Sequence, residues 1–458
     1  MSKSLPILFL SLALSAATAV GQAAPGNEAA KVDDRPAQEL FEDANGYLGR
    51  RYQEFNKQNL PYDPKLEAKT RKEQHDLAVK NATTLAGRTE LKDTDLYYLG
   101  MLHHLAGNAD DALDTMRRFL KDDPDGLNPQ TARNVVVLYA VKKNLLTEAD
   151  AAVAAYAKHQ PQNSEDRFKM ESLIADAYFR ASDYGQMLAH SNQMMEAAKT
   201  FTTERPAEVG KRDEMLSKSA SFLAQGFLKA NQRDRAVKVY DELRHLALTL
   251  PSGSLYKTAT GRLLSLNPNA NLGDIFSEKV ETRKEPPEVV ATQWIDQDPV
   301  KLSALRGQVV LLDFWAHWCE PCLYTFPKLE SWHETYKRQG LVVLGVTSYQ
   351  GHAEGKPLTP VEELKYLRNF KKEHRLAYGF AVADSHVNEL NYGVFSIPMS
   401  FLIDRKGNIR FIAAGANDQE IAQLGKMIKK VVEERDDSSD ATSQSGNDSQ
   451  KASPTSHP

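Results

Sequence analysis

The chain contains two cysteines, which are three positions apart in the segment Cys319-Glu320-Pro321-Cys322. A disulfide between them would close a very short loop and would restrain little of the entropy of the unfolded chain. Stabilisation is therefore a poor reason for the pair, and thiol chemistry is a better one. A structural zinc site would need four ligands, and the chain has no second cysteine pair.

The residues around the pair predict the setting that thiol chemistry requires. Val309–Phe314 predicts a buried strand, and the apolar spacing after the pair predicts a helix that begins there. A thiolate at a helix start is stabilised by the helix dipole and by free backbone N–H groups. Pro321 suits the first helical turn, where no N–H is needed, whereas the charge of Glu320 should disfavour the thiolate somewhat.

Spacing of i, i+3 places the two sulfurs one helical turn apart, which is close enough for a bond between them. We therefore predict that Cys319 attacks a substrate disulfide and forms a mixed disulfide. Cys322, deeper in the helix, would then resolve that intermediate.

The 458 residues are too many for one typical core, so we expect at least two domains. Helical spacing of apolar residues predicts a helical region at residues 37–265. A linker is predicted at 266–287. An α/β domain is predicted at 288–435, because short apolar runs alternate there with helical stretches. Residues 436–458 are polar and predict a disordered tail. The net charge of −4 and the lack of a long basic block give no reason to expect nucleic acid as a partner.

The N-terminus predicts export. Lys3 precedes an apolar run from Leu5 to Val20, and Ala17-Thr18-Ala19 is a small-x-small cleavage site. We assign residues 1–19 as a signal peptide and 20–36 as a flexible lead-in, which predicts a periplasmic or cell-envelope location. An uncleaved signal that anchors the chain is the alternative.

The helical region contains an internal repeat. Ala112 and Ala149 are 37 positions apart, as are Pro124 and Pro161, and looser copies follow. The pattern resembles tetratricopeptide repeats, although their strict period is 34. The resemblance implies a stack of helix pairs that binds a peptide or protein ligand. A packing spacer or a dimerisation module is the alternative.

The C-terminal region resembles the thioredoxin superfamily. Leu312–Cys322 looks like a thioredoxin active site, and Ser396-Ile397-Pro398 stands before a strand at Met399–Ile403 as the cis-proline loop does in that superfamily. Leu302–Gly307 and an insertion at Gly351–Tyr378, with a helix expected at Val361–Glu373, are typical of the exported TlpA/ResA branch. The resemblance implies an all-α repeat region followed by an α/β thioredoxin fold.

The resemblance also implies residue roles and partners. Pro398 would be cis and lie beside the sulfurs, and Ile397 would offer its backbone to a substrate chain. Trp318 would cover Cys319 and contact substrates. Protein disulfides would be the substrates and a membrane thiol relay the electron donor. No organic cofactor is implied, because the electrons reside on the sulfurs.

Two positions depart from the branch. Thr325 stands where the branch often has Glu, and Asp313 stands where it commonly has Asn. We therefore hypothesise that Asp313 is the buried proton acceptor that deprotonates Cys322; a solvated or salt-bridged Asp313 is the alternative. His317 is expected to be an exposed loop residue.

The pattern as a whole predicts an exported thiol–disulfide oxidoreductase. The Cys-Glu-Pro-Cys motif and Ile397 before the proline favour reduction of protein disulfides. Potentials in this superfamily range from about −270 to about −120 mV, so the direction of electron flow stays open. A redox-sensing or tethering adaptor, in which the repeats have the main role, is one alternative. A peroxide-reducing redoxin is another, but peroxiredoxins place Thr or Ser three residues before the reactive cysteine and Pro seven before. This chain has Ala316 and Leu312 there.

Overall fold

The computed structural model describes residues 33–270, 272 and 285–434. The predicted signal peptide, most of the lead-in, most of the linker and the polar tail lie outside these residues. The described chain forms two compact units that divide after Asn108. In the described part, no helix is long and apolar enough to cross a membrane.

The first unit contains four helices, which pack around a core of small and aliphatic side chains such as Leu40, Ala82 and Leu102. They are α1 (Ala37–Asn45), α2 (Tyr47–Lys57), α3 (Pro64–Ala86) and α4 (Asp93–Leu105).

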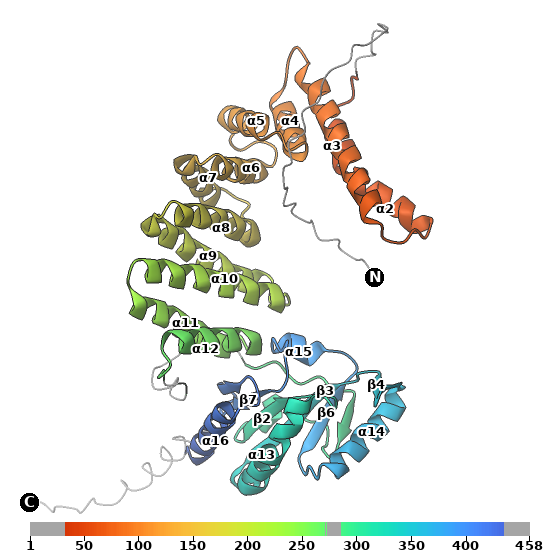
Figure 1. The fold of residues 1–458 in the computed structure, drawn as a ribbon, viewed down its shortest axis with the longest axis vertical. Helices are drawn as coiled ribbons and strands as arrows, with labels where there is room; N and C mark the ends of the chain where they lie inside the picture. Colours follow the sequence, from red (N-terminus) through yellow and green to blue (C-terminus); the bar gives the residue numbers. More distant parts are fainter. Residues whose placement is uncertain (1–32, 271, 273–284, 435–458) are drawn as a thin grey trace, which may run out of the picture. The chain divides into compact units, whose positions relative to one another are not determined.

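The second unit begins with eight consecutive helices, which Figure 1 shows stacked in chain order. They are α5 (Ala109–Asp122), α6 (Pro129–Lys142), α7 (Leu146–Lys158), α8 (Ser164–Arg180), α9 (Tyr184–Glu204), α10 (Val209–Lys229), α11 (Arg233–Thr249) and α12 (Gly253–Leu266). The predicted helical region is thus confirmed. Several of these helices have a polar residue at the N-cap, whose side chain accepts a hydrogen bond from an N–H group of the first turn. Asn163, for example, accepts one from the N–H of Asp166 at 3.0 Å.

The α/β domain follows, and its thioredoxin-like fold is as predicted. Its strands and helices are β1 (Gln293–Ile295), β2 (Val309–Phe314), α13 (Glu320–Tyr336), β3 (Leu341–Ser348), β4 (His352–Ala353), β5 (Lys356–Pro357), α14 (Pro360–Glu373), β6 (Gly379–Ala383), α15 (Val387–Asn391), β7 (Met399–Ile403), β8 (Ile409–Ala413) and α16 (Asp418–Glu433). Short 3-10 helices span Leu302–Leu305 and Lys337–Gln339. The insertion forms the β4–β5 hairpin and α14, close to the expected helix.

Six strands form a mixed sheet in the order β1-β6-β3-β2-β7-β8. Strands β2, β3 and β6 are parallel, and β1, β7 and β8 are antiparallel to their neighbours. Every residue of the central strand β2 is buried. A strand buried on both faces explains why its sequence is a continuous apolar run rather than an alternating one.

The two faces of β2 belong to different cores. Val309 and Leu311 pack in a cluster with side chains of α13, α14 and α16. Val310, Leu312 and Phe314 pack in a cluster that contains side chains of α10, α11 and α12. The last three helices of the stack therefore share a core with the sheet, which the sequence pattern did not predict.

Replacing Phe401 by Ala should test this second core. Phe401 is fully buried, and the centroid of its ring lies 5.5 Å from that of Phe314 and 4.9 Å from that of Tyr392. Loss of the ring should lower the free energy of unfolding by about 3–5 kcal/mol. All four tryptophans lie in the α/β domain, so urea unfolding followed by tryptophan fluorescence reports it. Val361→Ala, at a side chain 78% exposed, is the control; equal effects would contradict the assigned core.

Candidate active site

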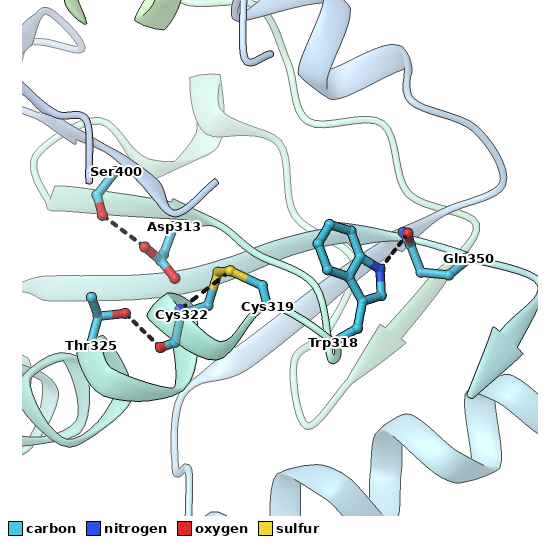
Figure 2. Close-up of a disulfide and its surroundings, with 7 residues drawn as sticks. All are labelled: Asp313, Trp318, Cys319, Cys322, Thr325, Gln350 and Ser400. Carbon is cyan, nitrogen blue, oxygen red and sulfur yellow. Dashed lines mark hydrogen bonds between the residues drawn. A yellow bond between two sulfur atoms is a disulfide. The ribbon is translucent and has the colours of Figure 1, made fainter. Parts of the chain in front are cut away.

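Cys319 and Cys322 form a disulfide at the start of α13 (Figure 2), so the structure shows the oxidised form. Cys319 is the residue directly before the helix, and its sulfur accepts a hydrogen bond from the N–H of Cys322 at 3.3 Å. Pro321 lies in the first turn, as predicted, and Glu320 beside it is exposed. After reduction, the same N–H groups and helix dipole would stabilise a thiolate on Cys319.

The two sulfurs differ in their surroundings. Cys322 is fully buried within the core shared by the sheet and α13, and Cys319 is 3% exposed at its edge. This order suits the predicted roles, in which an outer sulfur meets the substrate and an inner one resolves the intermediate.

Asp313 lies on β2, fully buried, on the strand face that also carries Val309 and Leu311. Figure 2 shows its carboxyl group directed toward Cys322. Its Oδ1 accepts a hydrogen bond from the Ser400 hydroxyl at 2.7 Å, and its Oδ2 has no hydrogen-bond partner among the described residues. The carboxyl is therefore neither solvated nor salt-bridged.

Burial raises the pKa of Asp313 from 3.8 to about 7, because a charged carboxylate is poorly stabilised away from water; the hydrogen bond from Ser400 offsets part of this rise. A carboxyl group with a pKa near neutrality can both accept and release a proton under ordinary conditions.

Ser400 is a site residue that the sequence analysis missed. It faces Asp313 across the antiparallel pair of β2 and β7, in direct register. The available signal was its position two residues after Pro398, but only the strand register shows which residue it meets.

Thr325 supplies no acid at the site. It is buried one turn after Cys322, and its hydroxyl donates to the carbonyl oxygen of Cys322 at 2.8 Å. The acid that Figure 2 shows beside Cys322 is Asp313, on the neighbouring strand β2.

The peptide bond between Ile397 and Pro398 is cis, as expected from the resemblance. Pro398 is buried, and Ile397 is half-buried and contacts both cores of the domain. The predicted pairing of the Ile397 backbone with a substrate stays a prediction.

Trp318 was expected to cover Cys319 and to contact substrates; its ring lies beside Gln350 instead, and the substrate contact stays a prediction. Trp318 is 56% exposed, and its indole is directed toward Gln350, whose Oε1 accepts a hydrogen bond from Nε1 at 2.9 Å (Figure 2). The backbone N–H groups of Gln350 and Gly351 donate to the buried carboxylate of Glu363 on α14, at 2.7 and 2.9 Å. The insertion thus determines where Trp318 points, which local sequence could not show.

His317 is buried rather than exposed. Tyr366 of helix α14 packs against the His317 ring, with 5.3 Å between the two ring centroids. Nε2 of His317 lies 4.0 Å from Oε1 of Glu363. Burial lowers the pKa of the imidazole, although the charge of Glu363 opposes this shift. The expectation failed because the covering helix is more than 40 residues away in the sequence.

Comparison with known proteins supports the class that this geometry suggests. Residues 283–412 match the model of the AhpC/TSA family. Over 154 residues the chain is 29% identical to the thiol-disulfide oxidoreductase ResA of Bacillus thuringiensis, a match that covers 34% of this chain and 80% of ResA. It is 30% identical over 135 residues to the protein DipZ of Mycobacterium bovis, covering 29% of this chain and only 18% of DipZ.

Among solved structures, a thiol-disulfide isomerase from Corynebacterium glutamicum is similar to this chain. The match covers 33% of this chain and 98% of the isomerase chain, with 23% identity and a TM-score of 0.28. The sequence matches show that the C-terminal domain is an AhpC/TSA-type redoxin domain with homologues among ResA and DipZ. The chain is accordingly a thiol–disulfide oxidoreductase of that kind. These relatives favour neither the adaptor nor the peroxide-reducing alternative.

The raised pKa of Asp313 predicts a specific pH dependence of stability. Below about pH 3 the carboxyl is protonated in both the folded and the unfolded chain, so burial has its smallest cost. As pH rises toward 7, only the unfolded chain ionises readily, and the folded chain loses stability. Relative to Asp313→Asn, the oxidised wild type should lose roughly 4 kcal/mol of unfolding free energy between pH 4 and pH 8. Parallel profiles from urea titrations would show that the carboxyl is not buried as described.

Proposed function

We propose that this protein reduces disulfide bonds in protein substrates by cycling Cys319 and Cys322 between dithiol and disulfide. The observation that supports this most is the disulfide at the start of α13 with the buried carboxyl of Asp313 beside its inner sulfur. A structural disulfide would have no use for a carboxyl group whose pKa is near neutrality.

The proposed reaction begins with the reduced pair. The Cys319 thiolate attacks one sulfur of the substrate disulfide, and the other substrate sulfur leaves as a thiolate that takes up a proton. Asp313 accepts the proton of Cys322, whose thiolate then attacks the Cys319 sulfur. The second substrate thiol is released, and two electrons have moved from the pair to the substrate.

The oxidised pair must then receive two electrons. We propose a membrane thiol relay as the donor and a periplasmic or cell-envelope location, because residues 1–19 have the pattern of a signal peptide. Potentials of related dithiols range from about −270 to about −120 mV. A measured potential of the Cys319–Cys322 couple near the lower end would support reduction, whereas a value near the upper end would indicate oxidation.

We further propose that the helical region binds a peptide or protein partner, in the manner of tetratricopeptide repeats. Successive helix pairs α6–α7, α8–α9 and α10–α11 contain the later copies of the repeat found in the sequence. Ala149, Ala175 and Ala236 are buried in these pairs, as small residues at helix contacts should be.

An insulin-reduction assay with dithiothreitol tests the proposed cycle. The full chain should accelerate reduction, and Cys319→Ser should abolish the acceleration because no nucleophile remains. Cys322→Ser should retain attack but not resolution. When the reduced variant is freed of dithiothreitol and then mixed with insulin, a mixed disulfide with the substrate should accumulate and be visible by mass spectrometry. If the mixed disulfide accumulated with Cys319→Ser instead, Cys322 would be the attacking cysteine and Cys319 the resolving one.

The role of Asp313 can be tested by its effect on resolution of the mixed disulfide. In wild type the resolution rate should rise with pH through about 7, the pKa of the carboxyl. Asp313→Asn should slow resolution by about 100-fold and remove this inflection. Asp384→Asn, at an exposed carboxyl after β6, is the control. Equal rates for Asp313→Asn and wild type across the pH range would rule out the proposed role.

A further inference from the structure

The segment that leads to the cis proline is held at both ends by helices of the repeat region. Residues 392–397, called here the 392–397 segment, connect α15 to Pro398 and β7. Ile397, whose backbone is predicted to pair with a substrate, is the last residue of this segment.

The start of α12 binds the first residues of the 392–397 segment. The N–H groups of Gly253 and Ser254 donate to the carbonyl oxygens of Tyr392 and Gly393 at 2.9 and 2.8 Å. N–H groups in the first turn of a helix have no partner within that helix, so the segment satisfies two donors that would otherwise be open. The contact is also tight, since a Cβ placed on Gly253 would lie 1.8 Å from the sulfur of Met399.

A buried carboxylate on α10 reinforces this contact. Asp213 is 5% exposed, and its Oδ2 accepts hydrogen bonds from the hydroxyls of Ser252 and Ser254. Gly393 has φ of +55°, and a Cβ there would lie 2.7 Å from the Ser252 oxygen and 3.1 Å from Oδ2 of Asp213. Glycine is needed at this position both for its backbone conformation and for the close approach.

The second half of the segment contacts the same helices at the surface. The ammonium group of Lys257 on α12 donates to the hydroxyl of Ser396, directly before Ile397, at 3.0 Å. Phe395 is 57% exposed, and Cζ of its ring lies 3.7 Å from the position that a Cβ on Gly210, at the start of α10, would take.

From these contacts we propose that α10 and α12 position the 392–397 segment for protein substrates, with Lys257 and Gly393 as positioning residues. The helical region then forms part of the substrate site, in addition to any partner that it binds elsewhere. This inference rests on the proposed reduction of protein disulfides, because it concerns how such a substrate is held.

The proposal separates two kinds of substrate. A protein disulfide would need the backbone of Ile397 in place, because its chain must pair with that edge before the sulfurs meet. A small aromatic disulfide such as 5,5′-dithiobis(2-nitrobenzoate) needs only access to Cys319. Displacement of the segment should therefore raise KM for a protein and leave the reaction of the small disulfide unchanged.

The experiment compares full-length Lys257→Met and Gly393→Ala with wild type. Arg262→Met, at an exposed position on another face of α12, is the control. Loss of the Lys257 hydrogen bond should lower kcat/KM for insulin about fivefold, mainly through KM. Gly393→Ala should lower it further. Rates with 5,5′-dithiobis(2-nitrobenzoate), the reduction potential of the pair, and all values for Arg262→Met should match those of wild type.

Amide hydrogen exchange of peptides that cover residues 392–397 provides a readout that needs no activity. Exchange should be faster than wild type in Gly393→Ala and unchanged in Arg262→Met. Unchanged exchange in Gly393→Ala would overturn the positioning role, whatever the wild-type activity. Equal losses with insulin and the small disulfide, or no loss with either, would overturn the role in substrate selection. If wild type showed no Cys319-dependent turnover of insulin, the proposed function itself would be overturned. The proposed role of the segment in selecting protein substrates would then fail with it.

Discussion

The burial of a carboxyl group next to a disulfide is the constraint around which this site is built. Asp313 is the penultimate residue of a fully buried strand, where an ionised side chain is costly, and a single hydroxyl from Ser400 compensates for part of that cost. The protein therefore tolerates a group that an aliphatic residue could replace with a gain in stability. Such a cost is typical of positions kept for chemistry rather than for folding.

The sheet that holds this carboxyl is covered by two layers of different origin. One face is covered by helices of the α/β domain itself, and the other packs against α10, α11 and α12 of the helical stack. The redox domain and the end of the stack thus share one core and one set of backbone hydrogen bonds at residues 392 and 393. Helix and sheet modules that look separable in the sequence are joined where the substrate would arrive.

Local pattern predicted the parts of the site that lie close together in the chain. The strand before the cysteines, the helix that starts at them and the cis bond before Pro398 all follow from short motifs, and the structure has each of them. The burial of His317 and the direction of Trp318 depend on α14, and the partner of Asp313 depends on the register of β7. These contacts join residues 30 to 90 positions apart, where spacing in the sequence carries no information about distance.

The two cysteines of this chain are also its whole capacity for electrons. Each molecule can hold one pair of electrons, and the chain has no third thiol through which a donor could reload it while a substrate is bound. In the proposed cycle, donor and acceptor would therefore use the same outer sulfur in alternation, and each would have to leave before the other could dock. Turnover in the cell would then depend on the ratio of the two partners around the protein, with an excess of either one slowing the exchange for the other.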